Sequence, residues 1–172
     1  MVRTIIIGYG NPDRQDDGAA WHVLSRLAGK LEYEVPSSFE EGLSPRGDNP
    51  DLYFTLQLTP ELEETLSQYE RVCFVDVHTG SIPVDIQLTS IQPIIQNSPF
   101  THHMTPATLL ALTQHIHNKS PNTTLVSIRG YEFGFDNLLS KKTSILVDEA
   151  VAKLWKWLQE GRAEYLAGSG KK

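Results

Sequence analysis

The stretch TIIIGYGNPDRQDDG, residues 4–18, joins a run of β-branched residues to a glycine-containing loop that carries two adjacent aspartates. Residues 4–7 predict a strand that is buried on both faces, which is typical of a parallel sheet. From about Asp17 the apolar residues recur with helical spacing, so a helix is expected directly after the loop. A buried strand, a tight loop and a helix in this order are the beginning of a β-α-β unit.

The same alternation continues along the chain. Segment 36–51 is rich in Pro, Ser, Gly and Asp and is expected to be a loop. The hydrophobic patterns predict strands at 53–58, 71–77, 84–89 and 124–128, a further short strand near 33–35, and helices at 59–69, 105–117 and 140–159. Thr59 is expected to cap the second helix. We therefore expect an α/β three-layer sandwich: a mostly parallel, twisted sheet of about five strands, with one antiparallel edge strand and helices on both faces.

Length and composition narrow the class of protein. The 172 residues predict one domain over 1–165 and a disordered tail over 166–172. A formal net charge of −6 argues against a nucleic-acid partner, which would require a basic surface. The single cysteine, Cys73, excludes an internal disulfide and a cysteine-based zinc site. The apolar N-terminal stretch is too short for a signal peptide or a membrane span, so a cytoplasmic protein without a membrane partner is expected.

Polar side chains gather where the predicted strands end. Ligands of open α/β sheets bind outside the carboxyl ends of the strands, so these residues are the candidates for function. They are Asp16 and Asp17 after the first strand, Asp76 and His78 at the end of RVCFVDV, His102 and His103 before the third long helix, and residues 129–132 after TLVSI.

The loop of residues 8–18 lacks the signature of a phosphate-binding turn. A dinucleotide fingerprint requires a third glycine where Asp13 stands, and no G-x-x-x-x-G-K-[ST] motif is present. Two carboxylates would also repel a pyrophosphate. A helix N-terminus stabilises negative charge, so Asp16 or Asp17 could simply cap the helix, or one could cap while the other points into a cleft.

Aspartate oxygens and imidazole nitrogens without a thiolate suit a divalent metal such as Ni, Zn or Mn. Two carboxylates and one histidine leave coordination positions open, for water or for a metal that arrives with its own ligands. His78 is the second choice for the histidine, because Gly80 and Pro83 predict that the strand ends before it shares a face with Asp76.

At this point the motifs match a known family. The chain resembles the hydrogenase maturation peptidases, which remove a C-terminal extension from the large subunit of [NiFe] hydrogenases. The resemblance rests on GYGNPDRQDDG, FVDV, THHMTPATLLAL and IRGYEFGFDNLLS and extends over nearly the whole chain. The motif QLTPEL, residues 57–62, is similar to the branch that serves bidirectional, NAD-linked hydrogenases. The acidic segment 36–51 departs from the compact Gly-Thr turn usual in the family.

The resemblance implies a hydrolase, an endopeptidase that acts after nickel insertion. It assigns the catalytic and metal-contacting roles to Asp17, Asp76 and His102, with a one-residue slip to His103 left open. Asp16 would then act as a base or as a cap. The nickel would be carried by the substrate, although another divalent metal could occupy the site of the isolated protein. The partner would be a hydrogenase large-subunit precursor, and the free peptidase would be a monomer.

Three other hypotheses remain at the level of sequence. The first is a nickel chaperone or scaffold for hydrogenase assembly that has the same metal site and no proteolytic activity. The second is a self-sufficient metallo-hydrolase that acts on small amides. The third is an α/β domain whose acidic residues serve only as caps and turns.

Overall fold

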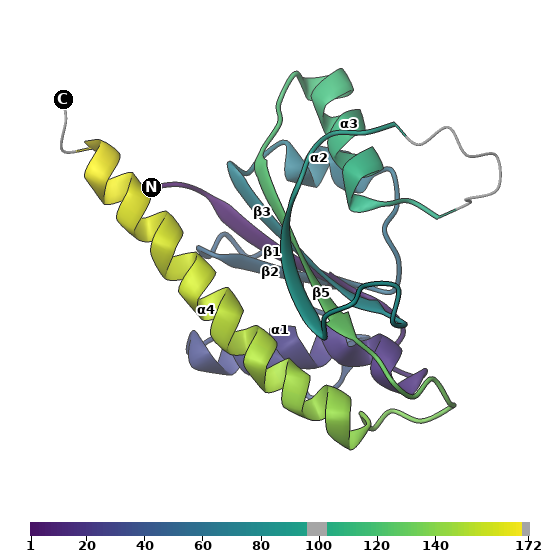
Figure 1. Ribbon diagram of the computed structural model, residues 1–172. Helices are drawn as coiled ribbons and strands as arrows, with labels where there is room; N and C mark the ends of the chain where they lie inside the picture. Colours follow the sequence, from purple (N-terminus) through teal and green to yellow (C-terminus); the bar gives the residue numbers. More distant parts are fainter. Residues whose placement is uncertain (96–102, 170–172) are drawn as a thin grey trace.

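The computed structural model describes residues 1–95 and 103–169 (Figure 1). Its strands are β1 (Thr4–Tyr9), β2 (Asp51–Thr55), β3 (Arg71–His78), β4 (Ile86–Ile91) and β5 (Asn122–Arg129). Its α-helices are α1 (Ala19–Lys30), α2 (Leu62–Leu66), α3 (Pro106–His117) and α4 (Lys141–Ser169). Short 3-10 turns, η1 (Gln15–Gly18) and η2 (Phe39–Glu41), precede α1 and β2.

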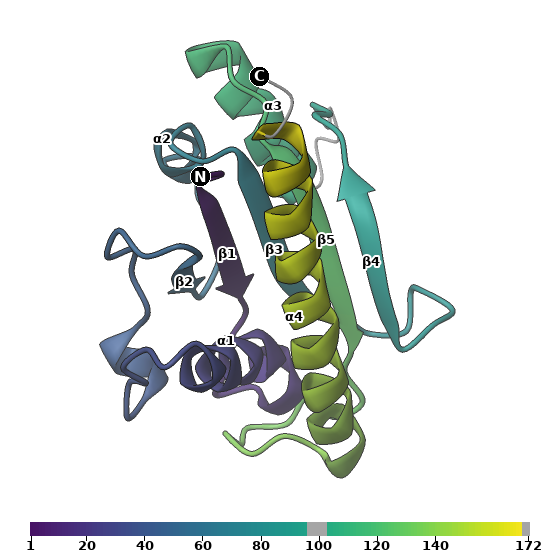
Figure 2. The ribbon, with the colours of Figure 1, turned by 90° about the vertical axis from the view of Figure 1, so that its left-hand side faces the viewer.

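In the described residues the strands form one five-stranded sheet with the order β2-β1-β3-β5-β4. Neighbouring strands run parallel, except that the edge strand β4 is antiparallel to β5. Figure 2 shows this order across the sheet, with β4 at the outer edge. The predicted fold class, including the single antiparallel edge strand, is confirmed.

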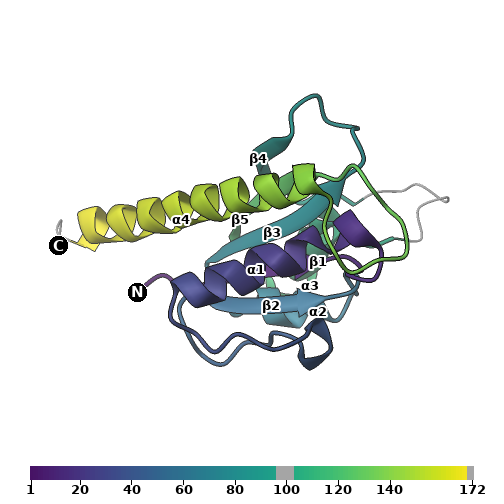
Figure 3. The same cartoon turned by 90° about the horizontal axis from the view of Figure 1, so that it is seen from below.

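Alternate residues of the central strands face two separate hydrophobic layers. Ile6 and Cys73 pack toward α1 and α4, whereas Ile5, Ile7 and Phe74 pack toward α2 and α3. This alternation follows from the two-residue period of a strand. Helices α1 and α4 lie side by side on one face of the sheet, and α2 and α3 cover the other (Figures 1 and 3).

The short strand predicted near residues 33–35 does not form. Residues 33–35 form no strand, because the Tyr33 amide donates to the carbonyl of Ala28 and thereby closes the end of α1. The strand predicted at 53–58 is present as β2, but it begins earlier, at Asp51 in the segment predicted to be a loop, and it ends at Thr55.

The helix predicted for residues 59–69 is shorter than expected. Its α-helical part spans Leu62–Leu66, and Glu61 rather than Thr59 stands at the cap position. At the start of α3, by contrast, the Thr105 hydroxyl accepts a hydrogen bond from the Thr108 amide, as expected of an N-cap.

Helix α4 does not end near residue 159, as the sequence pattern predicted, but continues to Ser169. Gly161, which we expected to follow the helix, lies within it. The absence of a side chain leaves room for Arg71, because a Cβ at this position would lie 1.5 Å from the Arg71 Nη1 atom. The Arg71 guanidinium lies over the Trp157 ring and donates to the Trp157 carbonyl. Residues 166–169 of the predicted tail therefore belong to α4.

No helix within residues 1–95 or 103–169 combines the length and the apolar character needed to cross a membrane.

Candidate functional site

The two aspartates of the first loop point in different directions. They are consecutive residues of the 3-10 turn η1, in which each residue is rotated by about 120° from the one before. Asp16 is fully buried, whereas Asp17 is partly exposed and lines a cleft. The Asp17 Oδ2 atom accepts a hydrogen bond of 3.0 Å from the Asn11 amide, which fixes one side of its carboxylate.

Gly10 allows the chain to pass directly against Asp17. Its φ angle is +140°, a conformation that side-chain-bearing residues rarely adopt. A Cβ at position 10 would lie 2.1 Å from the Asp17 carbonyl oxygen and 3.7 Å from its Oδ1 atom. The glycine in the quoted loop therefore serves the placement of a carboxylate.

Asp76 lies near the carboxyl end of β3, on the face of the sheet that α2 and α3 cover. Its Oδ2 atom accepts a hydrogen bond of 2.7 Å from the Tyr9 hydroxyl, and its Oδ1 atom accepts one from the Val77 amide. Burial raises the pKa of the Asp76 carboxyl, and the negative charge of Asp17 adds to this increase, although the hydrogen bonds and His78 oppose it. The two carboxylates are thus close enough to influence each other.

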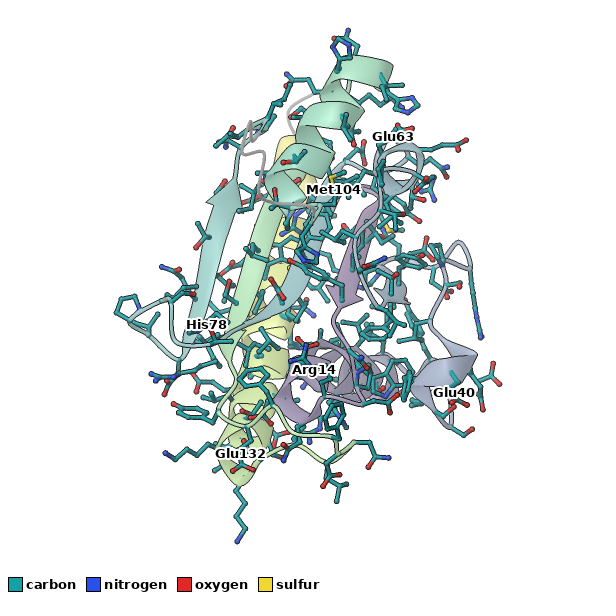
Figure 4. The ribbon with its side chains drawn as sticks, turned by 90° about the vertical axis from the view of Figure 1, so that its right-hand side faces the viewer. Arg14, Glu40, Glu63, His78, Met104 and Glu132 are labelled. Atoms are coloured by element: carbon teal, nitrogen blue, oxygen red, sulfur yellow. The ribbon has the colours of Figure 1, made fainter. Side chains whose placement is uncertain are left out.

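Asp17 and Asp76 line the same cleft, which has a volume of about 600 Å³. The cleft lies at the carboxyl ends of β1 and β3, where an open α/β sheet is expected to bind its ligand. Its wall contains polar and apolar residues from four segments: Tyr9, Gly10, Asp17, Leu56, Gln57, Leu58, Thr59, Pro60, Asp76, His103 and Met104. Figure 4 labels Met104, which lies just before α3.

A larger cavity of about 760 Å³ lies elsewhere, lined by residues from both ends of the chain, among them Val2 and Leu158. Among the described residues that line it, none carries a carboxylate, imidazole or thiol group. It therefore lacks the side chains for acid–base or metal chemistry, and the smaller cleft is the better candidate for a catalytic site.

The predicted histidine, His102, lies outside the described residues, and its role stays a prediction. Its neighbour His103 is exposed and lines the cleft. The prediction that β3 ends before His78 was wrong, because the strand includes this residue and pairs it with Arg129. His78 consequently lies on the same face as Asp76, at the far end of β3 (Figure 4), but it is buried and does not line the cleft.

Asp16 is neither a base in the cleft nor a cap of its own helix. Its carboxylate accepts five hydrogen bonds: from the amides of Tyr131, Glu132 and Ser140, and from the hydroxyls of Ser140 and Thr143. Burial alone would raise the pKa of the Asp16 carboxyl, but these hydrogen bonds outweigh it and hold the pKa below its ordinary value. Asp16 is thus a buried, ionised acceptor, which leaves Asp17 as the acid that faces the cleft.

Tyr9 is a site residue that the sequence analysis missed. Burial raises the pKa of its hydroxyl, and the neighbouring Asp76 carboxylate raises it further, so Tyr9 stays protonated and donates to Asp76. The alternation of Ile5, Ile7 and Tyr9 along β1 was the signal that could have placed it on the face of Asp76.

Within residues 1–95 and 103–169, no three His, Cys, Asp or Glu side chains are grouped so that they could hold a metal ion by themselves. The donors in the cleft that the structure describes are the two carboxylates, with His103 at the wall. Carboxylate oxygens and an imidazole nitrogen are donors that suit a borderline divalent metal.

The fold is similar to that of several solved structures. Hydrogenase maturating endopeptidase HybD from E. coli superimposes with a TM-score of 0.67 and 15% identity, over 92% of this chain and 93% of that one. The chain therefore has the fold of the hydrogenase maturation proteases.

Two further structures agree with this result. The [NiFe] hydrogenase maturation protease HycI from Thermococcus kodakarensis gives a TM-score of 0.65 at 15% identity, with 92% and 93% of the two chains covered. The hydrogenase 2 maturation peptidase from Thaumarchaeota archaeon SCGC_AB-539-E09 gives 0.59 at 20% identity, with 91% and 98% covered. Comparison with protein-family models and with curated protein sequences finds no match. These likenesses establish the fold and do not distinguish the branch that serves NAD-linked hydrogenases.

Proposed function

We propose that this protein is an endopeptidase that removes the C-terminal extension of a [NiFe] hydrogenase large subunit after nickel has been inserted. One observation carries the proposal: Asp17 and Asp76 face a common cleft at the carboxyl ends of β1 and β3. The shared fold of the maturation proteases supports it. The protein would act in the cytoplasm, as a monomer, on the precursor of the large subunit.

In the proposed mechanism the nickel is part of the substrate. Asp17, Asp76 and His102 contact the ion that the precursor presents, and this contact holds the nearby peptide bond in the cleft. Since the protein's own ligand set is incomplete, a precursor without nickel is held poorly, and cleavage waits for metal insertion. Water then adds to the scissile carbonyl, the C–N bond breaks and the proton passes to the leaving amine. Asp16 takes no part in these steps, because its carboxylate is buried and occupied by hydrogen bonds.

The test is to incubate the protein with nickel-loaded and nickel-free large-subunit precursor and to measure the intact mass of the precursor. We expect the loaded form alone to become shorter. Equal cleavage of both forms would rule out selection by the metal. A loaded precursor that keeps its full mass would refute the peptidase and support the non-proteolytic chaperone.

Point variants test which residues belong to the catalytic site. Asp17→Asn and Asp76→Asn should each abolish cleavage, while Asp13→Asn, an exposed acid in the same loop, should cleave like the wild type. Testing His102→Ala and His103→Ala in parallel decides which histidine contacts the metal. Retained cleavage in both aspartate variants would remove these residues from the site.

A further inference from the structure

The turn that carries Asp17 is attached to a distant part of the chain, the β5–α4 loop (residues 130–140). The Gln15 amide donates to the Asp136 carbonyl at 2.7 Å, and the Asp16 amide donates to the Glu132 carbonyl at 3.1 Å. The Gln15 side chain accepts a hydrogen bond from the Gly134 amide. Figure 4 labels Arg14 and Glu132, one residue from each of the two segments.

The carboxylate of Asp16 lies at the centre of this attachment. It is fully buried and collects donors at 2.7–2.9 Å from the β5–α4 loop and from the first turn of α4. These donors belong to residues about 115 to 127 positions further along the chain. Hydrogen bonds to an ionised acceptor are about twice as strong as neutral ones, so this group joins η1, the loop and α4 into one rigid unit.

Asp17 has little support of its own. Among the described residues its carboxylate accepts one hydrogen bond, from the Asn11 amide, and its own amide donates to the Arg14 carbonyl at 3.2 Å. The turn also contains Gln15 at a φ angle of +52°, a left-handed conformation that costs such a residue about 1–2 kcal/mol. A short turn that contains a strained residue persists only where its surroundings hold it.

We propose that Asp16 is the positioning residue of this site: its buried carboxylate holds η1 against the β5–α4 loop and thereby aims the adjacent Asp17 into the cleft. The inference rests on the role proposed above for Asp17. Asp16 itself touches neither the substrate nor its metal. It acts through the backbone. When residue 16 of a 3-10 turn is fixed, the side chain of residue 17 must point about 120° away from the side chain of residue 16.

The test uses Asp16→Asn in the full-length protein, with Asp13→Asn as the control. The asparagine side chain has the same size as aspartate, but its NH₂ group would face the N–H and O–H donors that now bond to the Asp16 carboxylate. We expect the affinity of the free protein for Ni²⁺ and the kcat/KM for the nickel-loaded precursor each to fall by about 10- to 100-fold. The amide proton of Asn11, which bonds to Asp17, should shift in the NMR spectrum of Asp16→Asn and stay in place in Asp13→Asn.

A double-mutant cycle separates positioning from general stability. If Asp16 acts through Asp17, Asp16→Asn should cause no further loss of Ni²⁺ affinity in an Asp17→Asn background. Equal losses in both backgrounds, or a folded Asp16→Asn that binds Ni²⁺ like the wild type, would overturn the proposal. Should Asp16→Asn not fold, Ser140→Ala and Thr143→Val each remove a donor and keep the carboxylate, and wild-type affinity in both would count against it.

Failure of the proposed function gives a different result. A wild-type protein that never shortens the precursor would refute the peptidase. The NMR signal of the Asn11 amide proton and the double-mutant cycle of Ni²⁺ affinity would still decide whether Asp16 positions Asp17.

Discussion

Replacing Gly10 by alanine should impair the site more than it impairs the fold. The new Cβ would lie 2.1 Å from the Asp17 carbonyl oxygen, whereas real Cβ atoms essentially never approach closer than 3.0 Å. The two segments must therefore separate by about 1 Å. The oxygen belongs to the backbone, so the whole of residue 17 has to move.

Two separate costs follow from this geometry. The φ angle of +140° adds backbone strain of about 1–3 kcal/mol to the folded state of Gly10→Ala. The displacement of Asp17 by about 1 Å should reduce the rate of tail removal by about 100-fold, the usual consequence of such a shift in a catalytic group. That factor corresponds to about 2.7 kcal/mol of transition-state free energy.

Gly42→Ala is the matched control. Gly42 also has a positive φ angle, +68°, but a Cβ there meets no described atom within 4 Å. Urea denaturation should show a loss of stability in both variants, whereas cleavage of the nickel-loaded precursor, followed by mass spectrometry, should fall in Gly10→Ala alone. If Gly10→Ala cleaves as fast as Gly42→Ala, the position of Asp17 does not limit the reaction and the reasoning is wrong.

Three further predictions concern pH and packing. Tyr9→Phe removes a hydrogen bond that lowers the pKa of Asp76, so the acid limb of the pH–rate profile of cleavage should move to higher pH. Asp16→Asn should lower the free energy of unfolding by about 3 kcal/mol at pH 7. The pKa of the Asp16 carboxyl is lowered from 3.8 in the folded state, so the ionised carboxylate stabilises the protein above pH 3.8. This stabilisation is lost as the pH falls through the folded-state pKa. Urea denaturation in acid should therefore show a smaller difference in stability between Asp16→Asn and the wild type. Gly161→Ala should destabilise the protein by about 1 kcal/mol in the same assay, although alanine is the better helix former, because the Cβ displaces Arg71.

Gly168→Ala is the control for the last of these. It lies in the same helix, and a Cβ there meets no described atom within 4 Å, so it should be neutral or slightly stabilising. A stabilising Gly161→Ala would show that Arg71 moves aside without cost. For Asp16→Asn, a difference from the wild type that grows as the pH is lowered would have the wrong sign for a lowered pKa.

Most strands and helices could be located along the chain from the sequence, because the buried strands are runs of β-branched and aromatic residues. The two main errors have different physical causes. The Tyr33 amide donates to the Ala28 carbonyl five residues earlier, which ends α1 instead of starting a strand. At Gly161 the partner is distant: Arg71 lies far earlier in the chain, so no local pattern reveals that this glycine leaves room for a guanidinium inside a continuing helix.

The candidate site was predictable in its location and not in its details. The predicted carboxyl ends of the strands placed the acids of the first loop and Asp76 at the same edge of the sheet. Residue type and spacing left both Asp16 and Asp17 able to cap a helix or face a cleft, and the family resemblance alone selected Asp17. The physical reason lies in the β5–α4 loop, whose donors to Asp16 lie more than a hundred residues away.

The direction of β1 and the length of α4 have a practical consequence. Strand β1 starts at the end of the sheet opposite the cleft, and α4 returns to that end, so that Val2 and Leu158 line one cavity there. Figure 1 shows the N-terminus and the last turns of α4 on the same side of the molecule. A tether attached to either end should therefore leave the cleft facing outward. Protein immobilised through a terminal tag should remain open to a large folded partner, which suits surface-based measurements of precursor binding.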